Sequence, residues 1–147
     1  MIMSKIVYDA KCMKLMSSFE FITRAKIKDI IENNEQNLIL FVVNPGEIIK
    51  AVGPKGANVK RLEQKFRKKI KIVEFSPELA NFIKNLIYPL KVADIISDNG
   101  VYTMTPVDSK TRSILIGKNA CNLRFYESVI KRYFKIEELR VGKQDGK

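Results

Sequence analysis

Two short loops in this sequence carry residues suited to binding an anionic oxygen. Residues 53–56 are Gly-Pro-Lys-Gly, and residues 117–120 are Gly-Lys-Asn-Ala. Glycine has no side chain, so the backbone beside it can come very close to a ligand. The helix expected after each loop would direct its free amides and the positive end of its dipole to the same place. Together with the mobile ammonium groups of Lys55 and Lys118, the loops predict phosphate binding.

The two loops are not chemically equal. Pro54 has no amide hydrogen, so the first loop is expected to offer only the amides of Lys55 and Gly56. Ala120 replaces the closing glycine of the second loop, and its methyl group would hold a phosphate away. We therefore expect the first loop to bind more firmly than the second. Neither loop resembles a nucleotide-triphosphate cradle, and the chain has no GxGxxG sequence.

Both loops belong to a longer repeat, in which a capping residue, a short apolar helix, the loop and a basic helix recur in the same order. One constant offset, the one that relates Gly53 to Gly117, matches the two copies without a gap. The matched residues of the first copy are Val43, Asn44, Val52, Gly53, Asn58, Glu63, Lys71, Ile72 and Glu74, and they fall on Val107, Asp108, Ile116, Gly117, Asn122, Glu127, Lys135, Ile136 and Glu138. The pattern predicts a duplicated structural unit.

The charge of the chain is concentrated at and after these loops. The formal net charge is +11, from 27 basic and 16 acidic residues. The stretch from position 50 to 71 contains nine basic residues and one acidic residue, Glu63. The stretch from position 110 to 135 contains seven basic residues and one acidic residue, Glu127. Such a distribution favours a polyanionic partner such as nucleic acid. Lysine-rich helices can also be simple solvated surfaces, so charge by itself leaves both interpretations open.

Other chemistries find little support in the residues. The chain has no histidine, and its two cysteines, Cys12 and Cys121, are far apart, so we expect no metal site, no disulfide, no cofactor and a reducing cytoplasmic compartment. The longest apolar run, residues 38–43, is too short to span a bilayer. No nucleophile and base come together in the sequence, and Glu63 and Glu127 have the (i, i+4) spacing of helix ion pairs, so we expect no enzyme.

Periodicity predicts the elements of the first unit, residues 14–76. A helix should run from residue 14 to about 24, a hairpin should follow with a turn at 33–35 and a buried strand at 38–43, and residues 44–47 (Asn-Pro-Gly-Glu) should form a helix-capping box. A short helix to about residue 52, the loop, a helix at 58–68 and a strand at 69–75 complete it. Residues 1–13 are expected to be a loosely ordered lead-in.

The same elements are predicted again in residues 77–141. A helix should begin near residue 77 and stop at Pro89, and strands at 91–96 and 101–107 should form a hairpin through an Asp-Asn-Gly turn. Asp108 should cap the short helix, and residues 136–141 should be the last strand, with a mobile tail at 142–147. The fold class is α+β, and the short junction predicts two units held at a fixed separation.

The order of these elements resembles a pair of KH domains of type II, in which a GXXG loop clamps about four nucleotides of single-stranded RNA. More closely, the chain is similar to the archaeal NusA-like transcription factors over residues 14–141. The resemblance rests on residues 41–43 (Phe-Val-Val), 49–61 (Ile-Lys-Ala-Val-Gly-Pro-Lys-Gly-Ala-Asn-Val-Lys-Arg), 82–86 (Phe-Ile-Lys-Asn-Leu), 116–119 (Ile-Gly-Lys-Asn) and 122–123 (Asn-Leu). The chain is too short for the polymerase-binding and S1 domains of the bacterial relatives.

The resemblance implies an RNA-binding factor in transcription termination or antitermination. Its RNA-contacting residues would be Gly53, Pro54, Lys55, Gly56, Asn58, Lys60, Arg61, Ile49, Val52 and Ile72 in the first unit, and Gly117, Lys118, Asn119, Ala120 and Arg124 in the second. The partners would be single-stranded RNA and, as a candidate, RNA polymerase, and we expect a monomer without membrane attachment. The alternative is a KH-fold scaffold that docks on polymerase or ribosomal components with weak or no RNA binding of its own.

Overall fold

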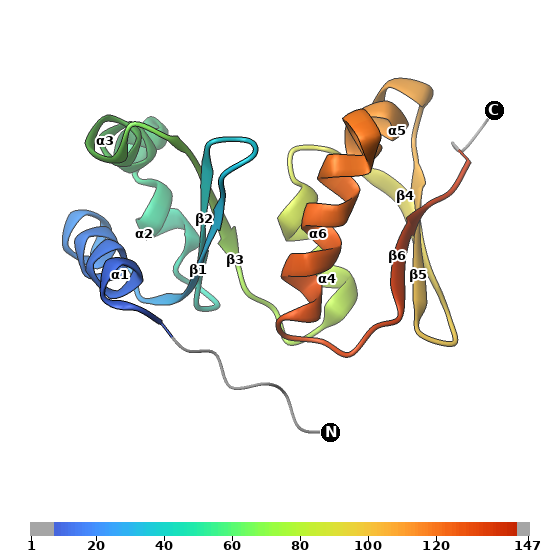
Figure 1. Ribbon diagram of the computed structural model, residues 1–147, viewed down its shortest axis with the longest axis horizontal. Coiled ribbons are helices and arrows are strands. Elements are labelled where there is room, and N and C mark those ends of the chain that lie inside the picture. Colours follow the sequence, from blue (N-terminus) through green and yellow to red (C-terminus); the bar gives the residue numbers. More distant parts are fainter. Residues whose placement is uncertain (1–7, 144–147) are drawn as a thin grey trace. The chain divides into compact units, whose positions relative to one another are not determined.

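The computed structural model describes residues 8–143, and the chain divides into two compact units between Pro77 and Glu78 (Figure 1). The first unit contains α1 (Ala10–Thr23), β1 (Ile27–Asn33), β2 (Leu38–Val43), α2 (Ile48–Val52), the 3₁₀ turn η1 (Pro54–Gly56), α3 (Ala57–Phe66) and β3 (Lys69–Glu74). The second contains α4 (Leu79–Ile87), β4 (Val92–Asp98), β5 (Val101–Pro106), α5 (Ser109–Ile116), the 3₁₀ turn η2 (Lys118–Ala120), α6 (Cys121–Lys131) and β6 (Glu138–Val141). The parts of the predicted lead-in and tail at residues 1–7 and 144–147 lie outside the described residues.

Each unit has one mixed three-stranded sheet with the same pairing. β1 is antiparallel to β2 and β2 is parallel to β3, while β4 is antiparallel to β5 and β5 is parallel to β6. Both predicted hairpins are therefore confirmed. In the second hairpin, Asn99 and Gly100 have φ angles of 51° and 84°, which are the left-handed conformations that the sequence predicted for this turn. Among residues 8–143, no helix is both long and apolar enough to cross a membrane.

The core of the first unit lies between its sheet and its helices. Phe19 of α1 stacks on Phe41 of β2 with ring centroids 4.4 Å apart, and Ala51 of α2 and Leu62 of α3 are fully buried in the same cluster. Figure 1 shows the three helices along one side of this sheet. Because α2 and α3 are both packed in this core, the two ends of the loop that joins them are held in place.

Three helix starts test the sequence rules for capping. α1 begins at Ala10 rather than at residue 14, because the side chain of Asp9 accepts a hydrogen bond of 2.8 Å from the amide of Cys12. The predicted capping box at residues 44–47 is wrong. α2 begins only at Ile48 without a side-chain cap, and the Glu47 carboxylate instead accepts a 2.7 Å bond from the amide of Lys26. The predicted cap at Asp108 is confirmed, with a 2.7 Å bond from the Thr111 amide.

Strand pairing corrects the register of the repeat. Leu38 of β2 pairs with Lys69 of β3, and Val101 of β5 pairs with Glu138 of β6. The equivalent residues Leu38 and Val101 of the central strands are therefore one position closer together in sequence than Gly53 and Gly117 of the loops. The equivalent residues Lys69 and Glu138 of the last strands are five positions further apart than the loop glycines. The predicted constant offset holds for the loops at residues 53 and 117 and for the helices beside them. It is wrong for the matches made in the last strands, because the segment between α6 and β6 is longer than the one between α3 and β3. The match of Val43 in β2 is wrong by one position.

The contrast between Asp108 and Asn44 gives the first prediction. We expect Asp108→Ala to lower the melting temperature at neutral pH and to speed hydrogen exchange at Thr111, whereas Asn44→Ala should change neither, because Asn44 does not cap α2. The hydrogen bond from the Thr111 amide lowers the pKa of the Asp108 carboxyl below its usual value. The stabilisation is therefore complete above that usual value and is lost as the pH falls through the lowered pKa.

Circular dichroism melts of the wild type and both variants at several pH values provide the measurement. Equal losses in the two alanine variants, or a loss for Asp108→Ala that persists in strong acid, would contradict the capping assignment.

Candidate nucleic-acid interface

The two loops have matching backbone conformations although they share only their first residue. Gly53 and Gly117 have φ, ψ angles of 79°, 168° and 73°, 173°. Lys55 and Asn119, at the third position, have angles of 54°, 29° and 55°, 31°. At the fourth position the φ, ψ angles are also similar, with 73°, 21° at Gly56 and 61°, 25° at Ala120. The similarity predicted from sequence thus extends to the backbone angles at these three positions.

The first glycine of each loop is required by the fold itself. Its φ, ψ combination is open essentially to glycine alone. In addition, a Cβ placed on Gly53 would lie 2.9 Å from Cγ of Asn58, and one on Gly117 would lie 2.8 Å from Cγ of Asn122. At this position, glycine clears space for a neighbouring side chain of the protein, and not for a ligand as the sequence analysis supposed.

The asparagine beside this glycine holds the two helices together. Nδ2 of Asn58 donates a 3.0 Å hydrogen bond to the carbonyl of Lys50 in α2, and Nδ2 of Asn122 donates a 2.7 Å bond to the carbonyl of Ile114 in α5. We call each of these bonds the asparagine brace. Sequence analysis found both asparagines as matched residues but assigned Asn58 only to RNA contact, which stays a prediction.

The fourth loop position is open to the outside. A Cβ at Gly56 would meet no atom within 4 Å, so glycine is favoured there by its positive φ and not by a neighbour. Ala120 adopts the same left-handed conformation, which costs a residue with a Cβ about 1 to 2 kcal/mol. The second loop therefore keeps its shape at some cost in strain, and its methyl group occupies the space that Gly56 leaves empty.

One predicted donor is used inside the loop. The amide of Gly56 donates to the carbonyl of Gly53 at 3.1 Å, and the amide of Ala120 donates to Gly117 in the same way, also at 3.1 Å. The expectation that the Gly56 amide serves a phosphate is therefore corrected, because this bond closes the turn. The other features predicted to serve an anion are the amide of Lys55, the positive N-terminal end of α3 or α6, and the lysine ammonium of each loop, and their role stays a prediction.

The positive charge of the first unit is less uniform than the sequence suggested. Lys50 lies 3.8 Å from Glu47, and Lys68 lies 3.3 Å from Glu32, so both charges have an acidic partner. Lys71 is partly buried on β3, and this burial lowers the pKa of its ammonium group. The other basic residues of this stretch are exposed, and they are Lys55, Lys60, Arg61, Lys65, Arg67 and Lys69. Most of them lie on the loop and α3.

In the second unit too, some basic side chains already have a partner within the protein. The predicted ion pair of Glu127 and Lys131 is confirmed at 3.7 Å, and the guanidinium of Arg112 donates to the carbonyl of Gly142 at 3.0 Å. Lys118 and Arg124 are exposed at the loop and on the first turns of α6. This loop and its helix thus present fewer exposed cations than the first.

Of the three apolar residues predicted to contact RNA, Ile49 is the one that has no apolar counterpart in the second unit. Ile49 of α2 is 86% exposed, Val52 is half-buried at the end of the same helix, and Ile72 of β3 is half-buried against the core. The carbonyl of Ile49 accepts the bond from the Gly53 amide, and that of Ser113 accepts the bond from the Gly117 amide. Ser113 is therefore the counterpart of Ile49, and the second unit has a hydroxyl where the first has an apolar side chain.

In each unit the loop brings a lysine side chain to the N-terminal end of a helix, an arrangement suited to an anion. Within residues 8–143, no group of three or more histidine, cysteine, aspartate or glutamate side chains could hold a metal ion. The predicted loop residues lie together in each unit, at the N-terminal end of a basic helix. These features define a class of loop, a tight turn that starts with glycine and leads into the N-terminus of a basic helix.

Comparison with known proteins gives this class a name. Residues 16–89 match the family model described as the KH domain. The solved structure described as the crystal structure of APE1850 has a TM-score of 0.74 and 25% sequence identity, and it covers 92% of this chain and all of its own.

Three curated relatives carry the description "Probable transcription termination protein NusA". The Methanocaldococcus jannaschii protein is 30% identical over 95% of this chain and 76% of its own length. The Methanococcus vannielii protein is 32% identical over 86% of this chain and 73% of its own, and the Thermoplasma acidophilum protein is 28% identical over 95% and 97%. The chain belongs to the archaeal NusA-like family of KH-domain proteins.

The fourth loop position gives a reciprocal prediction. We expect Ala120→Gly to stabilise the second unit by about 1 kcal/mol, because the left-handed strain of a Cβ is removed, and Gly56→Ala to destabilise the first unit by a similar amount. Chemical denaturation followed by circular dichroism measures both changes. If the two substitutions shift the unfolding midpoint in the same direction, the strain assigned to Ala120 is wrong.

The asparagine brace gives a third prediction. Asn58→Asp keeps the size of the side chain but places a carboxylate oxygen against the Lys50 carbonyl, so we expect faster hydrogen exchange of the Gly53 and Gly56 amides and a loss of about 1 to 3 kcal/mol in stability. Asn122→Asp should have the same local effect at Gly117. Unchanged exchange in both loops would show that the brace does not hold them.

Proposed function

We propose that this protein binds single-stranded RNA through two KH units of type II and acts as a factor in transcription termination or antitermination. The observation that carries the proposal is the pair of loops with similar backbone angles, each placed at the N-terminus of a helix with exposed cations. The names of the curated relatives support the role in termination. The element order and the parallel central strand pair in residues 14–76 and 77–141 support the type II assignment.

The RNA backbone would run along the first loop, with the ammonium of Lys55 and the positive end of α3 facing a phosphate. Lys60 and Arg61 on the first turns of α3 would neutralise neighbouring phosphates. Bases would lie against Ile49 and Val52, where an exposed aliphatic surface gives contact area without hydrogen-bond readout. We therefore expect strong salt dependence and modest sequence preference.

The second unit would add a weaker contact to the same RNA. Ala120 fills the outer space of its loop, and Ser113 replaces the apolar residue beside it. Lys118 and Arg124 still offer phosphate contacts. The alternative function, in which a KH-fold unit docks on polymerase or a ribosomal component, is favoured for this second unit by these two replacements. RNA polymerase is the protein partner that we propose for a factor of this type.

Two matched double variants test RNA binding. Pro54→Asp with Lys55→Asp, and Lys118→Asp with Asn119→Asp, change the net charge by the same amount in the two loops. We expect the first pair to weaken binding of an unstructured RNA of about eight nucleotides more than tenfold, and the second pair to weaken it less. Fluorescence anisotropy at several salt concentrations measures the affinity, and each lost phosphate contact should reduce the slope of log K against log salt by about 0.7.

The comparison distinguishes loop chemistry from net charge. Equal losses from the two double variants would assign the effect to overall charge, and an unchanged affinity with an intact circular dichroism spectrum would overturn the proposal. A complex with polymerase that survives nuclease and high salt would instead support the docking alternative. Small-angle scattering on the same samples tests our further proposals of a monomer and of a fixed separation between the units.

A further inference from the structure

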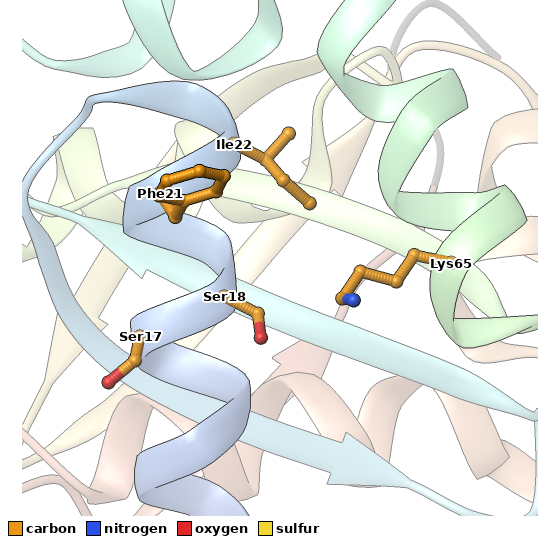
Figure 2. Close-up of a pocket in the computed structure, with 5 residues that line it drawn as sticks. All are labelled: Ser17, Ser18, Phe21, Ile22 and Lys65. Atoms are coloured by element: carbon orange, nitrogen blue, oxygen red, sulfur yellow. The ribbon is translucent and has the colours of Figure 1, made fainter.

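A hollow of about 430 Å³ lies between α1 and α3 of the first unit. Its walls are Ser17, Ser18, Phe21 and Ile22 of α1 and Lys65 of α3. Figure 2 shows the Lys65 side chain reaching from α3 toward α1, with Ser18 and Ile22 pointing toward it from the other wall. The serines leave space because their side chains are small, so the two helices are separated by a groove at this place.

An apolar stripe runs along α1 beside the groove. Phe21 is 76% exposed and Met13 is 59% exposed. The two residues are eight positions apart, which is about 12 Å, or slightly more than two helical turns, with Ser17 midway between them on the same face. Large exposed apolar side chains on one helix face mark interaction surfaces. Their spacing matches the repeat of apolar anchors on an amphipathic helix.

The second unit shows that the KH fold does not require this stripe. α1 ends at Thr23 and α4, the equivalent helix, ends at Ile87. When these two helix ends are matched, Phe21 corresponds to Asn85, and Ser17 corresponds to Asn81. A polar residue therefore occupies the position of Phe21 in α4, and Met13 falls on Pro77, before α4 begins. The exposed phenylalanine at the groove is an addition to the first unit.

The charges around the groove are mainly positive. Lys14, Arg24 and Lys65 are exposed on the two helices or at their ends. The carboxylate of Glu20 is held by a 2.9 Å hydrogen bond from the amide of Ile27, at the start of β1. An occupant that complements this surface has apolar side chains flanked by carboxylates.

The groove is better suited to a protein segment than to RNA. Of the five residues that line it, Lys65 alone carries a positive charge, which suits a single carboxylate but leaves most of a continuous phosphate chain without a partner inside the hollow. The guanidinium of Arg24 lies 5.9 Å from the centroid of the Phe21 ring, where it competes with a stacking base. Lys65 is also eight residues from Ala57, about 12 Å along α3, so the groove is at the end of this helix opposite the loop.

We propose that the groove between α1 and α3 binds an acidic amphipathic helix of a protein partner. One apolar side chain of the partner enters the hollow against Phe21 and Ile22, and another covers Met13 two turns away. A carboxylate of the partner bonds to Nζ of Lys65. This binding uses none of the loop residues, so it goes beyond RNA binding and does not depend on it.

A synthetic peptide tests the proposal with the full chain. The probe is a capped helical peptide of about 18 residues made of glutamate, alanine and leucine, with leucines along one face at a two-turn repeat. Its titration into ¹⁵N-labelled protein should shift the amides of α1 and α3. Phe21→Ser and Lys65→Glu should each weaken binding about tenfold or more, since they remove the apolar anchor and reverse the charge.

Two variants serve as controls. Ile96→Ser removes an exposed apolar side chain of β4 in the second unit and should leave peptide binding unchanged. Pro54→Asp with Lys55→Asp should also leave it unchanged, which separates this proposal from the RNA-binding one. The proposal is overturned by an absence of shifts at about 1 mM peptide, or by equal binding of a sequence-scrambled peptide. It is also overturned if RNA shifts the same amides and Phe21→Ser weakens the RNA instead.

Discussion

The shape of each candidate loop depends on one side-chain hydrogen bond, the asparagine brace. Asn58 and Asn122 lie on the helix after the loop and bond to a carbonyl eight residues earlier, on the helix before it. This bond fixes the angle at which the two helices meet. It also places the asparagine where a Cβ on the first loop residue would stand, so Gly53 and Gly117 follow from it. The glycine and the asparagine are therefore one structural unit.

Once this unit fixes the backbone, the other loop residues are free to differ in chemistry. The ammonium group sits at the third position in the first loop, as Lys55, and at the second position in the second loop, as Lys118. The fourth residue can carry a methyl group because its outer side is open. A common fold thus holds two surfaces of different charge and polarity. This explains why the repeat is clear in the backbone while the predicted binding strengths are unequal.

The features that could be predicted from the sequence are those that depend on residues close together in the chain. Asp108 was predicted correctly as a cap because its acceptor and the Thr111 amide are three residues apart. The cap at Asn44 failed because Glu47 finds its donor, the amide of Lys26, across the fold and 21 residues away. The matches at Lys71 and Ile72 failed for a similar reason. Ungapped residue matches cannot detect extra residues between helix and strand, whereas strand pairing can.

The groove beside α1 belongs to the features that the sequence could not reveal, because it exists only where two helices pack. Phe19 and Phe21 both belong to the helix predicted from the sequence, and the structure shows that Phe19 is buried in the core while Phe21 is exposed. α3 then connects both surfaces, with Lys60 near the loop and Lys65 at the groove. Salt weakens attraction at both ends of this helix, so ionic strength alone cannot separate them. Substitutions of the apolar residues Ile49 and Phe21 can separate them, because Ile49 belongs only to the proposed RNA surface and Phe21 only to the groove.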